Sequence, residues 1–357
     1  MKKFLFYLGH PAHAHNFIYI SKILSERGHT ILFAVRERKI LVDLVKQFGY
    51  KYLIIKDNRK NNSVLSMFKS ILYREYKMFR IIKWFKPNLM AGTDIVITHL
   101  GKVFNVPSII LCDDDSSVVP LMSNLGFRFS SAILAPNICD IKPFNFKKIG
   151  YLGFQKLTYL HPKYFSPNKS LINNTINLNI RYFIIRVVNL TAHHDKNIRG
   201  INNEVLDSII KLLTKYGQVY ISSERCIPRK YHSLILPIEP KLIHHAMFYS
   251  DLFISDSQSM TVESCILGIP SIRYSDFIGK INVLEELEHK YKLTYAISPS
   301  QPDKLLKKIE ELVKLPNAKK KWKKRKIKML RNMIDVASFI STIFENYPAK
   351  NNIVTRD

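Results

Sequence analysis

The sequence predicts an α/β protein of two domains, each built on a doubly wound parallel sheet, with the domains facing each other across a cleft. The chain has 357 residues, which is too many for one ordinary hydrophobic core and suits two domains of about 150 to 200 residues each. Its composition, 46% hydrophobic and 23% charged, is that of a folded protein and excludes wholesale disorder or a fibrous repeat. Short apolar runs alternate with segments of helical period along the whole chain, which is the pattern of repeated strand-helix units.

The first domain opens with a strand, a loop, a helix and a second strand. Residues 3–8 form a short apolar run, residues 16–27 place apolar side chains on one helical face, and residues 30–35 form the next apolar run. Strands joined in this way pair in parallel, and ligands of such sheets bind beyond the carboxyl ends of the strands, where the loop at 10–15 lies. The remaining elements are expected at 52–56 (strand), 63–85 (helix), 87–91 (strand), 93–105 (helix), and 107–112, 132–135 and 148–152 (strands).

The second domain repeats this alternation after a linker rich in proline and asparagine at residues 161–179. We assign residues 1–165 to the N-terminal domain and 180–335 to the C-terminal domain. Residues 336–357 are expected to be a helix that packs back on the N-terminal domain, followed by a tail. Pro316 is expected to separate the last two helices. The predicted elements of this half are strands at 182–188, 218–221, 234–236 and 252–255 and helices at 203–215, 241–249, 301–315 and 318–346.

The charge of the chain is its strongest compositional anomaly. A formal net charge of +27 favours a polyanionic partner or an anionic surface. The densest basic run lies at residues 319–331 and is interrupted by Trp322, as in helices that lie at a membrane interface. We interpret this run as a patch that contacts the anionic inner membrane, and the alternative is a solvated helix in a lysine-rich protein. No zinc finger, RNA-recognition motif or basic zipper accompanies the charge, so no nucleic-acid partner is expected.

The N-terminal residues and the cysteines indicate the cellular compartment. Lys2 and Lys3 are followed by an apolar run of only about five residues, which is too short for a signal peptide. No stretch approaches the roughly 18 apolar residues of a membrane span. We therefore expect a cytoplasmic protein that is peripheral at the inner membrane. The four cysteines are scattered without a CxxC pair, so neither a disulfide framework nor a zinc site is expected.

The segment at residues 255–263 carries most of the chemical information. It runs from a predicted strand into a predicted helix that ends at Gly-Ile-Pro, residues 268–270. A helix N-terminus offers unpaired N–H groups and a positive dipole to a phosphate, so Ser257 and Ser259 are predicted to hold phosphate there. Glu263 lies one turn further on, where its carboxylate can accept hydrogen bonds from two ribose hydroxyls. The alternative is that Ser259 is an ordinary N-cap and Glu263 a solvated helix residue.

This segment resembles the donor-binding strand-loop-helix of glycosyltransferases of the B type (GT-B), among them the N-acetylglucosaminyl transferase of peptidoglycan synthesis. The residues that follow the order of that motif are Ser257, Thr261, Val262, Glu263 and Gly-Ile-Pro at 268–270. Gln258 and Ser259 stand where the motif has glycine. The resemblance implies that a nucleotide-sugar binds to Ser257, Gln258, Ser259, Thr261 and Glu263.

Over the whole chain the sequence resembles a prokaryotic family, domain of unknown function family 354, which is itself similar to GT-B enzymes and to UDP-N-acetylglucosamine 2-epimerase. The resemblance rests on His-Ala-His-Asn-Phe at 13–17, His-His-Asp at 193–195, Ile-Ser-Ser-Glu at 221–224 and Pro-Ser-Ile-Arg at 270–273. It implies two Rossmann-like domains of the GT-B type. It implies no cofactor, since the nucleotide-sugar is a substrate.

Two residues of the first domain are candidates for catalysis. In transferases similar to this one, a histidine after the first strand acts as general base on the acceptor hydroxyl, and His13 matches it in distance from the end of the first helix. The neighbouring histidines His10, His13 and His15 could instead bind a metal, but no cysteine or acidic cluster has ligand spacing, so no metal is expected. A purely structural role for any one of them is the other alternative. Asp113 begins a run of three aspartates after a predicted strand. The resemblance to the epimerase implies an acid there that moves a proton, although Gly-His-Pro replaces that enzyme's arginine-bearing first loop; an acidic helix cap is the alternative.

The second domain adds three residues at predicted strand ends, Arg186, His194 and Glu224, of which Arg186 would offset pyrophosphate charge. We therefore predict a metal-independent glycosyltransferase that moves a sugar from a nucleotide-sugar, UDP-linked, to a glycan or lipid-linked acceptor in surface polysaccharide biosynthesis. One alternative is a nucleotide-sugar epimerase similar to UDP-N-acetylglucosamine 2-epimerase. The other is a basic nucleic-acid-binding protein, which only the charge supports.

Overall fold

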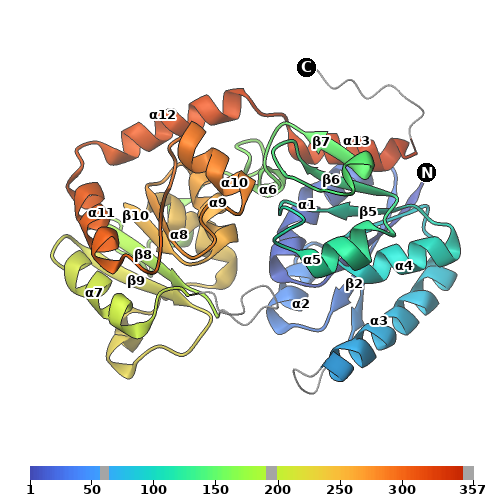
Figure 1. The fold of residues 1–357 in the computed structure, drawn as a ribbon, viewed down its shortest axis with the longest axis horizontal. Helices are drawn as coiled ribbons and strands as arrows, with labels where there is room; N and C mark the ends of the chain where they lie inside the picture. The colour runs from blue at the N-terminus through green and yellow to red at the C-terminus, as the bar shows by residue number, and fades with distance from the viewer. Residues whose placement is uncertain (57–63, 190–198, 349–357) are drawn as a thin grey trace. The chain divides into compact units, whose positions relative to one another are not determined.

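The structure, a computed structural model, describes residues 1–56, 64–189 and 199–348. The described chain divides into two compact units (Figure 1). The N-terminal unit consists of Met1–Tyr159 together with the chain from Ile334 onward, and the C-terminal unit is Leu160–Met333. Each unit contains one parallel sheet flanked by helices, which confirms the predicted fold class.

The N-terminal unit has a sheet in the order β3-β2-β1-β4-β5-β6-β7, and all neighbouring strands are parallel. Its strands are β1 (Lys3–Leu8), β2 (Thr30–Arg36), β3 (Lys51–Ile55), β4 (Leu89–Gly92), β5 (Ser108–Leu111), β6 (Ala132–Pro136) and β7 (Lys148–Tyr151). The strand order reverses between β1 and β4. In open parallel sheets the carboxyl ends of two such strands border the ligand-binding crevice. Residues after β1, β4 and β5 are therefore positioned for function.

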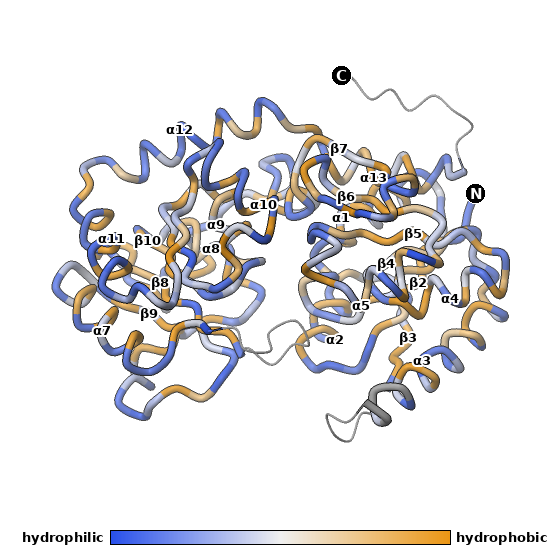
Figure 2. Tube along the Cα trace, viewed as in Figure 1, coloured by the Kyte–Doolittle hydropathy of each residue, from blue (hydrophilic) through white to orange (hydrophobic). Residues whose placement is uncertain are grey.

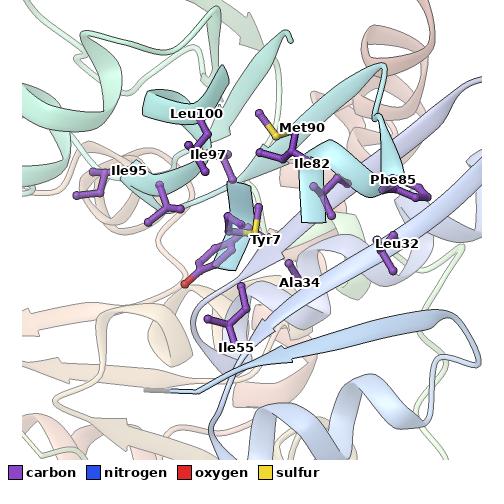
Figure 3. Close-up of a cluster of buried hydrophobic side chains, with 13 residues drawn as sticks. Tyr7, Leu32, Ala34, Ile55, Ile82, Phe85, Met90, Ile95, Ile97 and Leu100 are labelled. Atoms are coloured by element: carbon purple, nitrogen blue, oxygen red, sulfur yellow. The ribbon is translucent and has the colours of Figure 1, made fainter. Parts of the chain in front are cut away.

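Alternation along β1 decides which helices cover each face of this sheet. Phe4 and Phe6 point to one face, where the ring of Phe6 lies 4.7 Å from Phe17 and 5.7 Å from Phe344. Tyr7 points to the other face and belongs to a buried cluster with residues of α3 and α4 (Figure 3). The helices of this unit are α1 (Pro11–Glu26), α2 (Lys39–Lys46), α3 (Val64–Phe85), α4 (Ile95–Phe104), α5 (Pro120–Met122), α6 (Leu157–Leu160) and α13 (Val336–Asn346). A π-helical turn at Ser123–Phe127 and a 3-10 turn at Asn145–Lys147 complete it.

The C-terminal unit has a parallel sheet in the order β12-β11-β10-β8-β9. Its strands are β8 (Tyr182–Val187), β9 (Gln218–Ser223), β10 (Leu252–Ser255), β11 (Ser271–Tyr274) and β12 (Tyr295–Ile297). Its helices are α7 (Asn203–Leu213), α8 (Ile243–Tyr249), α9 (Gln258–Leu267), α10 (Asn282–Glu285), α11 (Pro302–Lys314) and α12 (Ala318–Arg331), with 3-10 turns at Lys169–Leu171, Arg229–Leu234 and Pro240–Leu242 and a π turn at Glu286–Lys290. Here the order reverses between β8 and β10, so the residues after these two strands are the candidates.

The predicted helix at 318–346 is wrong, because the structure breaks it into α12 and α13. The break is defined by Asp335, whose side chain accepts a hydrogen bond from the backbone N–H of Ser338 and so caps a new helix. The chain then enters the N-terminal unit, where Arg27 and His29 both contact Glu345 of α13. The predicted strand at 234–236 is also wrong: only an isolated bridge joins Ile235 to Ile221.

The interpretation of Trp322 as an interfacial residue is wrong. Its side chain is fully buried in the C-terminal unit, and its indole N–H donates to the carbonyl of Leu293 at 2.7 Å. The guanidinium of Arg325 lies 4.4 Å from the centre of the indole ring. The tryptophan therefore fastens α12 to its own unit. Among the described residues, no helix has both the length and the apolar composition needed to cross a membrane.

Candidate functional site

The N-terminal unit gathers its polar side chains beyond the carboxyl ends of β1, β4 and β5, which are adjacent strands. Gly92 ends β4 where the chain passes close to β1: a Cβ added there would lie 2.7 Å from the carbonyl oxygen of Tyr7. Only glycine permits this approach. It brings Thr93, the next residue, beside the start of α1.

His13 lies in the first turns of α1 and not in a loop, because the helix begins five residues earlier than the predicted residue 16, at Pro11. Proline at the first helical position and the side chain of His10, which accepts from the N–H of Ala12 at 3.3 Å, define this start. The Thr93 hydroxyl lies 2.5 Å from Nδ1 and 3.0 Å from Nε2 of the His13 ring.

The surroundings of His13 favour its neutral form. Burial, followed by the neighbouring His10 ring and the positive charges of Lys156 and Arg38, holds the pKa of His13 well below its usual range. A neutral imidazole can accept a proton at neutral pH. The geometry therefore suits the predicted role of general base, with Thr93 fixing the orientation of the ring.

The acidic run after β5 divides into three different roles. The carboxylate of Asp113 lies 3.1 Å from Nζ of Lys156, which is buried. Burial and the charge of Asp113 raise the pKa of Asp114 to about 7, so this carboxyl keeps its proton to near neutrality. Asp115 is buried and accepts a hydrogen bond from the N–H of Asp140 at 2.6 Å, which stabilises the loop. Only Asp113 and Asp114 are thus placed for chemistry.

The raised pKa of Asp114 predicts a pH dependence of stability. Because the folded state holds this proton between about pH 4 and pH 7 and the unfolded state does not, stability should fall as pH rises towards 7, by at most about 1.4 kcal/mol per pH unit. Asp114→Asn should remove this contribution. Asp256, whose pKa is also raised, changes the stability in the same direction, but it does so equally in the wild type and in the variant. The difference between the two urea-unfolding series from about pH 5 to about pH 8 isolates Asp114, and parallel series would contradict the assignment.

Sequence reasoning missed a buried ion pair that supports Thr93. Asp94 caps α4 by accepting from the N–H of Val96, and its other oxygen lies 2.6 Å from Nη1 of Arg74 on α3. The same guanidinium nitrogen donates to the hydroxyl of Tyr7 at 3.3 Å. The pair holds the turn that presents Thr93 to His13. The signal in the sequence was an aspartate near the start of the helix predicted at 93–105, but nothing indicated its arginine partner on another helix.

In the C-terminal unit, β10 passes into α9 through a short polar turn. Ser257 is the N-cap of α9: its hydroxyl accepts from the N–H of Met260 at 3.3 Å, so the alternative in which Ser259 is the cap is wrong. Thr261 donates its hydroxyl proton to the carbonyl of Ser257. Gln258 donates to the Ser275 hydroxyl at 2.8 Å, which ties the helix start to the end of β11. Ser259 is exposed at this helix start.

Glu263 is buried, so its interpretation as a solvated residue is also wrong. Its Oε2 lies 3.1 Å from Nε2 of His244, a buried residue of α8. The helix that carries Glu263 ends at Gly268, which adopts φ 75° as the left-handed C-cap, as the Gly-Ile-Pro sequence predicts. The contact between His244 and Glu263 is the second that sequence reasoning missed, because only tertiary packing brings α8 and α9 together.

Two further predicted residues, Arg186 and Glu224, lie at the ends of β8 and β9. Arg186 pairs with the carboxylate of Glu224 and donates to the Ser222 hydroxyl at 2.8 Å. His194 lies outside the described residues. The missed residue is Asp256, which is buried directly after β10 and accepts from the N–H groups of Val188 at 2.9 Å and Ile201 at 3.1 Å.

Within the described part of the chain, no three histidine, cysteine, aspartate or glutamate side chains form a group that could hold a metal ion. The contacts described above join the polar groups of these sites to hydroxyls, histidine, lysine, arginine and backbone N–H groups. Such sites can bind a polar substrate and move protons.

These two sheets and the sites at their switch points define the class of the protein as an α/β protein of the GT-B fold. Solved structures of that fold are similar to it across almost their whole length. They include UDP-GlcNAc 2-epimerase from Neisseria meningitidis bound to UDP-GlcNAc (TM-score 0.67, 16% identity, 98% of this chain and 100% of that chain), CalG4, the calicheamicin glycosyltransferase (0.61, 11%, 97% and 99%), and MurG from Acinetobacter baumannii (0.60, 12%, 96% and 99%).

The chain belongs to a family described as protein of unknown function (DUF354), whose model matches residues 5–284. A search among curated proteins finds no match to the sequence. The matched range includes both polar sites, from His13 to Glu263, so both sites lie in the part of the chain that defines the family.

Proposed function

We propose that the protein is a glycosyltransferase that uses a nucleotide-sugar donor, UDP-linked, and a glycan or lipid-linked acceptor in surface polysaccharide biosynthesis. The observation that carries the proposal is the turn from β10 into α9. It combines a helix N-terminus capped by Ser257 with a buried carboxylate, Glu263, further along the same helix. The first feature suits a diphosphate and the second suits paired ribose hydroxyls. A similar structure contains bound UDP-GlcNAc, which supports the choice of UDP.

The proposed reaction assigns different tasks to the two sites. Ser257, Ser259 and the helix N-terminus would hold the diphosphate, and Arg186 would offset its charge. His13, neutral and oriented by Thr93, would take the proton of the acceptor hydroxyl as that oxygen attacks the anomeric carbon and the UDP–sugar bond breaks. UDP leaves with the bonding electron pair. No step in this scheme requires a metal.

Calorimetric titration with UDP, GDP and CMP tests the donor site directly. We expect UDP to bind and Glu263→Gln to weaken it by about tenfold to a hundredfold, because hydrogen bonds to a charged group are worth about 1.5–3 kcal/mol. Glutamine is chosen because it keeps the shape of the side chain beside His244. Alanine would leave His244 buried without its partner. Glu239→Gln, at an exposed glutamate of the same unit, is the matched control and should bind UDP as the wild type does. If none of the three nucleotides binds the wild type, the proposed function fails.

A second candidate function is a nucleotide-sugar epimerase similar to UDP-GlcNAc 2-epimerase. It is favoured by the proton-handling groups of the N-terminal unit, where Asp114 titrates near pH 7 and Asp113 pairs with buried Lys156. Incubation with UDP-GlcNAc in deuterated water, without acceptor, separates the candidates. An epimerase exchanges the proton at the inverted carbon and forms a second UDP-sugar, whereas a transferase leaves the donor unlabelled.

A further inference from the structure

Helix α3 uses only one of its faces to build the N-terminal unit. Met78, Ile82 and Phe85 are buried and join the cluster that covers the sheet (Figure 3). The opposite face carries four large apolar side chains that remain exposed, namely Leu72, Tyr76, Phe79 and Trp84, of which Trp84 is 67% exposed. Figure 2 shows hydrophobic and hydrophilic residues interleaved along this helix. The core therefore does not explain these four apolar residues of α3.

Three of these exposed residues form a stripe along α3, and the stripe reaches a neighbouring helix. Leu72, Tyr76 and Phe79 are spaced by four and three positions, so they lie along one stripe of the helix. Helix α4 packs beside α3, where the Phe79 ring lies 4.9 Å from Phe104, and it adds the exposed Val103. We call this set the α3 surface: Leu72, Tyr76, Phe79, Trp84 and Val103.

Basic residues accompany the α3 surface along α3, just after it and on α4, and the acidic residue of α3 itself is paired. The basic side chains are Lys69, Lys77, Arg80, Lys83, Lys86 and Lys102. The acidic residue of α3 is Glu75, and its carboxylate lies 2.6 Å from Nδ1 of His99. Lys77 lies over the rings of Tyr73 and Tyr76, at 5.4 and 5.9 Å from their centres. The surface thus combines apolar anchors with an excess of basic side chains.

We propose that the α3 surface docks onto an anionic lipid bilayer. Exposed aromatic and aliphatic side chains enter the boundary between headgroups and acyl chains, and each nearby lysine or arginine adds about 1 kcal/mol of attraction to an anionic leaflet. Helix α12 carries a denser basic run, but its tryptophan is buried and cannot enter a bilayer. The docking surface lies in the N-terminal unit and requires nothing of the nucleotide-sugar activity.

The two tryptophans of the chain make this docking measurable. Trp322 is 0% exposed, so only Trp84 can move from water into lipid. We expect tryptophan emission to shift to shorter wavelength with vesicles of phosphatidylcholine and phosphatidylglycerol in equal parts, and to stay unchanged with phosphatidylcholine alone. Trp84→Phe should remove the shift while co-sedimentation with the anionic vesicles persists. An absence of both shift and co-sedimentation in the wild type overturns the proposal.

A matched pair of double variants separates docking from general attraction to a basic protein. Phe79→Ser with Lys83→Glu alters the α3 surface, and Phe146→Ser with Lys324→Glu makes the same change at exposed residues elsewhere. The first pair should reduce vesicle affinity by about tenfold or more and the second by about twofold or less. Equal losses overturn the proposal. Lys83→Glu alone, at an exposed position, keeps the test valid if the first double variant fails to fold.

A short DNA duplex tests the other anionic partner. If the duplex binds with the same dependence on Phe79 and Lys83 and the vesicles do not bind, the surface is assigned to nucleic acid and the proposal is overturned.

Discussion

Replacing His13 with alanine should lower the turnover of the proposed transfer reaction by about a hundredfold or more and leave UDP affinity unchanged. The imidazole is held by the Thr93 hydroxyl, and its lowered pKa keeps it neutral and able to accept a proton. Alanine removes this base, while the predicted UDP contacts lie in the other unit. The measurement is the initial rate of acceptor-dependent UDP release, beside calorimetry with UDP.

His15→Ala is the matched control for this experiment. His15 lies on the same helix, and its ring packs 5.2 Å from that of Tyr159, away from Thr93. The His15→Ala variant should keep the wild-type turnover within a few-fold. Equal losses of turnover in His13→Ala and His15→Ala would contradict the role of His13 as base, because they would show that both histidines only support the structure of α1.

The pH dependence of the wild-type rate gives a further check. Because the pKa of His13 is depressed, this rate should hold as pH falls through about 6.5, where an ordinary histidine would become protonated.

Replacing Trp322 with alanine should lower the free energy of unfolding of the C-terminal unit by about 3–5 kcal/mol. The indole is fully buried, its N–H donates to Leu293, and Arg325 lies over its ring. Truncation leaves a cavity and a carbonyl without its donor. Urea unfolding followed by circular dichroism measures the loss.

The other tryptophan supplies the comparison. Trp84→Ala, at a largely exposed side chain, should change the free energy of unfolding by no more than about 0.5 kcal/mol. The two substitutions are chemically identical, so a large difference reports the burial of Trp322 and the contacts that its indole makes. A small change in the free energy of unfolding for Trp322→Ala would contradict the packing described above, because it would indicate that α12 is a helix whose tryptophan faces solvent.

Local pattern determined most of the architecture. Apolar runs such as Lys3–Leu8 and Ser108–Leu111, the helix that Gly268 closes, and the strand-helix alternation all follow from residues adjacent in sequence, and they fixed the fold class before any contact was known. The same reasoning placed Ser257 at the end of a strand and the start of a helix, where the structure has it. It misplaced the start of α1 because proline and a histidine cap extend that helix towards the strand.

Partners distant in sequence were decided only by the tertiary structure. The spacing of residues did not show that Thr93 meets His13, that Asp94 pairs with Arg74 or that His244 contacts Glu263, because each contact joins two separate elements. For the same reason the sequence did not show whether the Trp322 side chain is buried or faces outward. A lysine-rich helix with one tryptophan satisfies the pattern of an interfacial helix and of a packed helix equally, and only the cavity that its neighbours leave for the indole decides between them.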